Sequence, residues 1–319
     1  MNYYRNMKES KKTAIVKVER DLERQSFNIE KAIDAFLEAQ DIREISKLVY
    51  RKGVEKFLHW MASNNITQPN RNSILRFKTF LIESDLSANS VNSYLVSVKR
   101  YFSYLQGEGL YADIAANVKG PTPPKGFLRE SPTEEQVKDL LAGIDTSLIQ
   151  GKRNFAMINL MARVGLRTCE VVRANLEDIK QSSGEALLWV QGKGKDGKDD
   201  FNVLTAKSLK PIHVYLKARG KVEPTDPLFC SHSDRSNGQR LNTGTIRKIS
   251  KDAFRSIGID SKKLSAHSFR HFAATASIKA GAEPLQTMAM MRHSSLTTTM
   301  RYVHNIQRIE KAAERFVDF

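Results

Sequence analysis

The sequence contains only two cysteines, Cys169 and Cys230, and they lie far apart in the chain. No CxxC pair and no Cys/His cluster with zinc-ligand spacing occurs, so we expect neither a disulfide framework nor a structural zinc site. Long apolar runs are also missing. No stretch of about 18 apolar residues is present to cross a bilayer, and the first residues lack the apolar segment of a signal peptide. Together these features predict a cytoplasmic protein with reduced thiols and no membrane partner.

Negative charge is scarce as well. The 319 residues include 51 Lys and Arg against 35 Asp and Glu, which gives a formal net charge of +16. This excess favours a polyanionic partner, because each neutralised phosphate releases condensed counterions. A merely soluble basic protein is one alternative. Binding to an anionic membrane surface is another, and it is disfavoured because no basic amphipathic helix with a continuous apolar face stands out.

Apolar residues with helical spacing predict a compact helical domain at 28–115. The pattern recurs in four segments, at 28–40, 45–65, 72–84 and 87–109. In the last of them, Ser87 or Asn89 is the expected N-cap, and Gly107 or Gly109 is the expected end. The basic tail at 1–27 precedes this domain and is too short for a folded module of its own.

A linker is predicted at 116–126, because GPTPPKG places three prolines and two glycines within seven residues and cannot continue a helix. The second domain, at 127–319, opens with a helix near Pro132 and is mostly helical. Its one exception is a strand at 187–190, a tight turn at Asp196-Gly197 and a second strand at 201–204. The expected fold class is therefore mainly α, with a small antiparallel β-hairpin in the second domain.

Four motifs of the second domain each carry a cation or a proton carrier. They are GLRTCE at 165–170, GKG at 192–194, HSFRH at 267–271 and RHSSLTTTMRY at 292–302. Their candidate reactive residues are Arg167, Lys193, His267, Arg270, His293 and Tyr302. His267 and Arg270 are three residues apart, so they share one face of a helix. No paired-carboxylate motif accompanies them, although metal-dependent phosphoryl transfer needs carboxylates to hold its metals.

This set of side chains suits metal-free cleavage of a phosphodiester. Arginine forks match phosphate oxygens and keep their proton, so two of them can clamp the phosphorus centre. A tyrosine hydroxyl can attack phosphorus and form a covalent intermediate. A histidine can accept the tyrosine proton or bind a phosphate oxygen, and a lysine can protonate the leaving 5′ oxygen.

The four motifs, in this order, resemble those of the tyrosine recombinases, the lambda-integrase/Xer family. The resemblance covers nearly the whole chain: 28–115 is similar to the family's SAM-like core-binding domain, and 127–319 to its catalytic domain. It implies a site-specific DNA recombinase that cuts and rejoins DNA through a 3′-phosphotyrosine. It implies no metal, ATP or organic cofactor.

The resemblance also implies a role for each residue. Arg167 is the first catalytic arginine, and Glu170 supports the site without reacting. Lys193 is the mobile lysine that acts as general acid, although Lys195 and Lys198 are rivals for this role. Four further roles follow: His267 and Arg270 form the middle pair, His293 binds a phosphate oxygen, and Tyr302 is the nucleophile.

Three features near the motifs depart from this pattern or stand outside it. The family usually has Gly before the late histidine, and this chain has Arg292, which we expect either to contact the DNA backbone or to point to solvent. His271 and His304 flank the site residues, and we interpret both as structural neighbours. Cys169, near Arg167, is interpreted as a small buried residue.

The polar face of the helix predicted at 87–109 is a candidate DNA contact, and a merely solvated face is the alternative. Its residues are Asn89, Ser90, Asn92, Lys99 and Arg100. Arg51 and Lys52 are further candidates for backbone contacts, and Arg292 joins the DNA-binding set. The expected partner is double-stranded DNA with a specific recombination site.

Apolar residues after Tyr302 follow one helical stripe. They are Ile306, Ile309, Ala313, Phe316 and Val317. The stripe either packs on its own domain or, as the resemblance implies, docks into a neighbouring subunit, which predicts a cyclic homotetramer on two duplexes. A second recombinase or an accessory protein remains an open partner. Integrase, invertase and chromosome-dimer resolvase remain open as tasks, with a type IB-like topoisomerase or a non-catalytic DNA-binding regulator as alternative functions.

Overall fold

The computed structural model describes residues 31–123, 130–192, 194–310 and 312–317. The chain forms two compact units, Met1–Lys125 and Gly126–Phe319, and the division falls within the proline-rich segment. The predicted tail at 1–27 lies outside the described residues, and the predicted domain limits stay predictions. In the part of the chain that the structure describes, no helix is long and apolar enough to cross a membrane.

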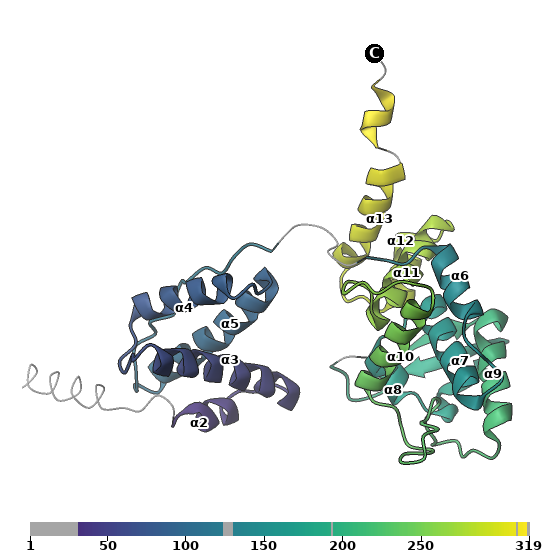
Figure 1. Ribbon diagram of the computed structural model, residues 1–319, viewed down its shortest axis with the longest axis horizontal. Coiled ribbons are helices and arrows are strands. Elements are labelled where there is room, and N and C mark those ends of the chain that lie inside the picture. Colours follow the sequence, from purple (N-terminus) through teal and green to yellow (C-terminus); the bar gives the residue numbers. More distant parts are fainter. Residues whose placement is uncertain (1–30, 124–129, 193, 311, 318–319) are drawn as a thin grey trace, which may run out of the picture. The chain divides into compact units, whose positions relative to one another are not determined.

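The first unit is a helical bundle (Figure 1). Its core is rich in aromatic side chains. Its described helices are α2 (Ile33–Glu38), α3 (Glu44–Ser63), α4 (Arg71–Glu83) and α5 (Ala88–Gly107). Ser87 caps α5 by accepting a hydrogen bond from the backbone N–H of Ser90, so the first of the two predicted caps is the one used. At the crossing of α3 and α5, a Cβ on Gly53 would lie 2.4 Å from the Ser97 side chain. Glycine therefore lets these two helices pack closely.

The second unit is mostly helical, so the predicted fold class is confirmed. Its described helices are α6 (Glu134–Ala142), α7 (Ile149–Val164), α8 (Thr168–Arg173), η1 (Leu176–Asp178), α9 (Ala206–Arg219), α10 (Thr243–Ser256), α11 (Ala266–Lys279), α12 (Pro284–Met291), α13 (Leu296–Glu310) and η2 (Ala313–Phe316). Helix α7 carries many of the buried apolar residues of this unit's main core. The first helix, α6, begins after Thr133, which caps it in a reciprocal capping box with Gln136.

The sheet has three antiparallel strands where the sequence predicts two. They are β1 (Ile179–Ser182), β2 (Glu185–Val190) and β3 (Asp200–Leu204). The tight turn lies between β1 and β2, at Ser183-Gly184, where both residues have positive φ as a two-residue hairpin requires. The predicted tight turn at Asp196-Gly197 is wrong. The β2–β3 ladder ends at the pair Val190 and Asp200, so the whole segment 191–199 makes that connection.

A glycine sets the course of the chain into the first motif. Gly165 ends α7 with φ of 67°, a left-handed conformation that favours glycine. A Cβ at this position would lie 2.5 Å from the sulfur of Met291. Because the chain reverses here, Arg167 comes to lie as the N-cap of α8, beside the turn that joins α12 to α13.

Candidate active site

The turn between α12 and α13 gathers two of the predicted catalytic arginines. Arg270, on α11, is 2% exposed, and its guanidinium donates to the carbonyl of Gly165 at 2.6 Å and to the carbonyl of Met291. Arg167 donates to the carbonyl of Arg292 at 3.2 Å. The two guanidinium groups therefore reach the same turn from α11 and from the start of α8, and this turn leads into His293.

Glu170 is fully buried beneath this turn and holds two arginines. Its carboxylate accepts from the Arg167 guanidinium at 2.7 Å and from the Arg292 guanidinium at 2.6 Å. It also accepts from the backbone N–H of Arg167 at 2.7 Å. Burial alone would raise the pKa of Glu170, but the two arginines outweigh it and lower that pKa. The supporting role implied for Glu170 has a structural basis in these contacts.

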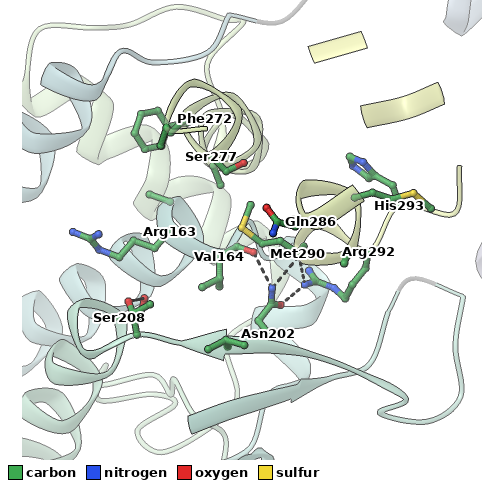
Figure 2. Close-up of a pocket in the computed structure, with 18 of the residues that line it drawn as sticks. Arg163, Val164, Asn202, Ser208, Phe272, Ser277, Gln286, Met290, Arg292 and His293 are labelled. Carbon is green, nitrogen blue, oxygen red and sulfur yellow. Dashed lines mark hydrogen bonds between the residues drawn. The ribbon is translucent and has the colours of Figure 1, made fainter. Parts of the chain in front are cut away.

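Arg292 corrects the expectation of a DNA-contacting or solvent-exposed side chain. Its side chain is 4% exposed, because the guanidinium reaches inward to Glu170 and to the amide oxygen of Asn202. Figure 2 shows the contact between Arg292 and Asn202, together with the bonds from the Asn202 amide to the carbonyls of Met290, at 2.9 Å, and Val164, at 3.3 Å. Arg292 is thus part of the internal support of the site. Its φ of 51° lies in the left-handed region, which favours glycine.

His293 is oriented by the helix that follows it. Its Nδ1 lies 2.8 Å from the hydroxyl of Thr299, a fully buried residue of α13. Burial and the positive charges of Arg270, Arg167 and Arg292 lower the pKa of His293 to about 4. The imidazole is therefore neutral at neutral pH. With Nδ1 engaged by Thr299, the Nε2 atom is the one left to face a ligand.

Tyr302 lies on the inner face of α13 and is 6% exposed. Its ring stacks on His293 with centroids 6.3 Å apart, and its hydroxyl lies 2.7 Å from Nδ1 of His271. His267 is exposed at the start of α11, and its ring meets that of His271 edge-on at 4.8 Å. Burial raises the pKa of Tyr302, and the nearby Arg270 opposes this only in part. His271 is therefore more than the structural neighbour that the sequence analysis expects.

Lys193 lies outside the described residues, whereas both rival lysines are described. Lys198 donates to both carboxylate oxygens of Asp178, at 2.7 and 2.6 Å. Lys195 donates to Asp199 at 2.8 Å. Ion pairs thus engage both rivals, and Lys193 stays the predicted general acid.

Two models of known protein families match this chain. Residues 131–308 match the model of the phage integrase family, and residues 33–109 match the SAM-like N-terminal domain of phage integrases. The chain belongs to the phage integrase family. This confirms the resemblance seen in the four motifs and makes the protein a tyrosine recombinase.

Individual relatives of this recombinase agree with the family. It is 32% identical to tyrosine recombinase XerA of Pyrococcus furiosus over 77% of this chain and 81% of that protein. It is 28% identical to tyrosine recombinase XerD of Vibrio cholerae over 86% of this chain and 91% of that protein. Among solved structures, XerH bound to a palindromic difH substrate has a TM-score of 0.71 at 20% identity, covering 91% of this chain and 85% of that one. A lambda integrase dimer on a core site has a TM-score of 0.66 at 14% identity, covering 85% and 95%. Because the identities are only 20% and 14%, these two structures establish a shared fold and nothing more.

The candidate DNA contacts of the first unit lie on α3 and α5 of the recombinase. Lys52, Asn89 and Arg100 are exposed. Ser90 and Lys99 are half-buried, and Arg51 pairs with two acidic neighbours on its own unit. Asn92 departs from the expected groove-facing orientation: its amide donates to the carbonyl of Pro121 at 2.9 Å, so it packs against a later segment of its own chain.

The contacts of three site residues are not predictable from the sequence, each for a physical reason. Thr299 sits within a run of similar hydroxyl residues, and only the packing of α13 selects it. Asn202 alternates with exposed residues along β3, a pattern that marks an inward position without giving its partners. His271 meets Tyr302 only because α11 and α13 pack together.

The lowered pKa of His293 predicts how the stability of the recombinase depends on pH. The unfolded histidine titrates near a pKa of about 6.5. Since the folded pKa is about 4, the unfolded state binds the proton more tightly between these values. The contribution of His293 to stability is therefore complete above about pH 6.5 and declines as the pH falls toward 4. We expect the difference in melting temperature between wild type and His293→Gln to shrink from pH 7.5 to pH 5. A difference that stays constant or grows would contradict this assignment.

Proposed function

We propose that this recombinase cuts one DNA strand with Tyr302 and holds the broken end as a 3′-phosphotyrosine. The observation that carries the proposal is the position of the Tyr302 side chain, stacked on His293 and within the field of Arg270. A hydroxyl from the partner duplex then attacks the phosphotyrosine, which releases Tyr302 and joins the strands. Repetition of the exchange on the second strands completes recombination at a specific site.

The site carries more positive than negative charge, and the scissile phosphate is the group that we expect to compensate it. Arg167, Arg270 and Arg292 surround one buried carboxylate, that of Glu170. Burial and the charge of Arg167 lower the pKa of Arg270 to about 9, so it remains a cation at neutral pH while its charge is poorly compensated. A phosphodiester supplies the missing negative charge. Arg167 and Arg270 clamp its non-bridging oxygens as the transition state gains charge.

The remaining roles follow the family resemblance. Lys193 protonates the leaving 5′ oxygen. His293 donates a hydrogen bond from Nε2 to a phosphate oxygen, an arrangement that the Thr299 contact at Nδ1 supports. His267, exposed at the start of α11, is the second histidine available to the phosphate. Each of these groups acts without a metal ion.

Double-stranded DNA is the proposed partner, with the first unit supplying further contacts. Lys52 and Arg100 are the exposed cations among the candidates, and they suit the phosphate backbone. Asn89 is exposed at the start of α5 and is the candidate for reading a base. Arg51 reaches DNA only by leaving its acidic partners, Asp34 and Glu55.

A homotetramer on two duplexes is proposed from two complementary surfaces of the second unit. A groove of about 1310 Å³ lies among α6, α7, β3, α11 and α12, and Figure 2 shows Arg163, Phe272 and Gln286 among its lining residues. The chain after α13 runs away from the other helices of this unit (Figure 1) and exposes apolar side chains, with Phe316 83% exposed and Val317 63% exposed. Docking of this segment into the groove of a neighbour buries both surfaces.

Removal of residues 311–319 is therefore expected to separate DNA binding from assembly. The truncated protein should bind a single duplex with nearly unchanged affinity. It should form complexes that hold two duplexes at least about tenfold less well, because every 1.4 kcal/mol of lost contact is a factor of ten. Native gels with two differently labelled duplexes measure both quantities. Leu285→Asp, in the groove, should give the same defect from the other surface, and normal two-duplex assembly by both variants would contradict the docking proposal.

Covalent trapping tests the proposed chemistry. The protein is mixed with labelled, nicked duplexes tiled across the DNA that flanks its own coding region, with a chelator present, and then denatured in detergent. We expect a shifted band with wild type and no band with Tyr302→Phe, while both proteins bind the same duplex. A band that survives Tyr302→Phe would remove Tyr302 from the mechanism. Relaxation of plasmids without any specific site would instead favour a topoisomerase.

A further inference from the structure

Tyr302, the proposed nucleophile, contacts His271, a residue to which the four motifs assign no role in the reaction. The Tyr302 hydroxyl lies 2.7 Å from Nδ1 of His271, and the two ring centroids are 5.5 Å apart. The distance is that of a direct hydrogen bond between a phenol and an imidazole. Because burial raises the pKa of Tyr302, the phenol keeps its proton at neutral pH. That proton must therefore leave as the oxygen attacks phosphorus.

We propose that His271 accepts the Tyr302 proton during strand cleavage and returns it during rejoining. The inference rests on the proposed function, in which Tyr302 is the nucleophile. In the forward step the O–H proton moves to Nδ1 of His271, and the phenol oxygen forms a bond to phosphorus. The bond from phosphorus to the 5′ oxygen breaks, and that oxygen takes a proton from Lys193. In the reverse step the attacking 5′-hydroxyl gives its proton back to Lys193, and the imidazolium of His271 returns its proton to the departing Tyr302 oxygen, so protons balance over a cycle.

The other histidines near Tyr302 are placed less well for this transfer. His293 lies nearly parallel to the tyrosine ring, with an interplanar angle of 9°, so it faces the plane of the ring. Its Nδ1 is engaged by Thr299. His267 is exposed at the start of α11, and its ring meets that of His271 edge-on, with centroids 4.8 Å apart. His271, by contrast, has a ring nitrogen within hydrogen-bond distance of the reacting oxygen.

The surroundings of His271 suit a group that gains and loses a proton. A cavity of about 230 Å³ adjoins the pair and is lined by His271, Tyr302, Thr275 and the ion pair of Lys279 with Glu310. The cavity has room for several waters. Water in this cavity would let the proton held by His271 exchange with solvent.

The test separates activation of the nucleophile from protonation of the leaving group. Single-turnover cleavage is measured with an ordinary duplex and with one in which sulfur replaces the 5′-bridging oxygen, since a thiolate leaves without a proton. His271→Asn retains an acceptor near the position of Nδ1 but takes no proton, and His271→Ala removes both. Lys193→Ala, which removes the proposed proton donor to the leaving group, is the comparison variant. Melting temperature and DNA binding report whether each variant is folded.

We expect His271→Asn and His271→Ala to cleave about 100-fold or more slowly on both duplexes, the usual contribution of a general base. Lys193→Ala should be slow on the ordinary duplex and recover on the sulfur duplex. Wild-type rates for His271→Asn, or recovery of the His271 variants on the sulfur duplex, would overturn the inference. If wild type forms no adduct, or if Tyr302→Phe still forms one, the proposed function itself fails. Failure of the proposed function therefore shows in wild type or Tyr302→Phe, whereas failure of the His271 inference shows only in the rates of the His271 variants.

Discussion

Arg270→Ala is expected to slow strand cleavage by about 1000-fold. Loss of one preorganised donor to a transition-state oxygen typically costs about 100- to 1000-fold in rate. Arg270 contributes more than its own charge, because its donors also tie the carbonyl of Gly165 to that of Met291. The variant therefore loses a phosphate donor and loosens the turn that presents His293. Single-turnover cleavage of a nicked duplex measures the effect.

Arg270→Lys separates these two contributions. The lysine keeps the positive charge, but a single ammonium group cannot reproduce the planar fork that reaches both carbonyls. We expect it to lose most of the activity while it binds DNA normally. Arg255→Ala, which removes a half-exposed arginine from α10, is the matched control and should cleave normally. If Arg270→Lys cleaves as fast as wild type, the fork is not what the site requires.

Arg292→Ala is expected to destabilise the second unit by about 3–5 kcal/mol. That is the usual cost of removing one partner from a buried ion pair, since the other charge is left without compensation. Here the stranded group is Glu170, which is fully buried and would keep only its bonds to Arg167. Asn202 would also lose the guanidinium that donates to its amide oxygen. Equilibrium unfolding in urea at neutral pH measures the change.

Arg292→Gly provides the internal comparison for this prediction. The variant loses the same ion pair, but it relieves the left-handed backbone at this position, which costs a non-glycine residue about 1–2 kcal/mol. We therefore expect Arg292→Gly to be more stable than Arg292→Ala by about that amount, although less stable than wild type. The opposite order of the two variants, or wild-type stability for Arg292→Ala, would refute the internal role of Arg292.

The sequence predicts the helical part of the fold well because apolar spacing carries the information. In α5 the apolar residues Val91, Leu95, Val98 and Phe102 recur at helical spacing and are buried, and the helix begins after Ser87, one of the two expected caps. Strand β1 was missed because its residues are mostly exposed and show no apolar alternation. Asp196-Gly197 suggests a tight turn because Asp-Gly is a strong hairpin dipeptide, but the pairing of β2 with β3 ends at Val190 and Asp200, too far from it for a two-residue turn.

Some residues of the candidate site can likewise be predicted from local sequence patterns, whereas others depend on tertiary packing. The order of the four motifs is enough to nominate Arg167, Arg270 and Tyr302, because each lies at a fixed spacing from motif residues. The inward path of Arg292 follows from the position of Glu170 on a different helix, which no local pattern contains. The contact between His271 and Tyr302 likewise depends on how α11 and α13 cross. Local spacing nominates candidates, and only the packing of distant helices assigns their partners.

Identification of the modified side chain in the trapped adduct tests the central claim most directly. The covalent complex formed on a nicked duplex is digested with nuclease and protease, and the peptide that carries the residual nucleotide is sequenced by mass spectrometry. The account predicts a nucleotide joined through its 3′ phosphate to the Tyr302 oxygen, in the peptide that follows Arg301. A nucleotide on another side chain, or one joined through a 5′ phosphate, would contradict it.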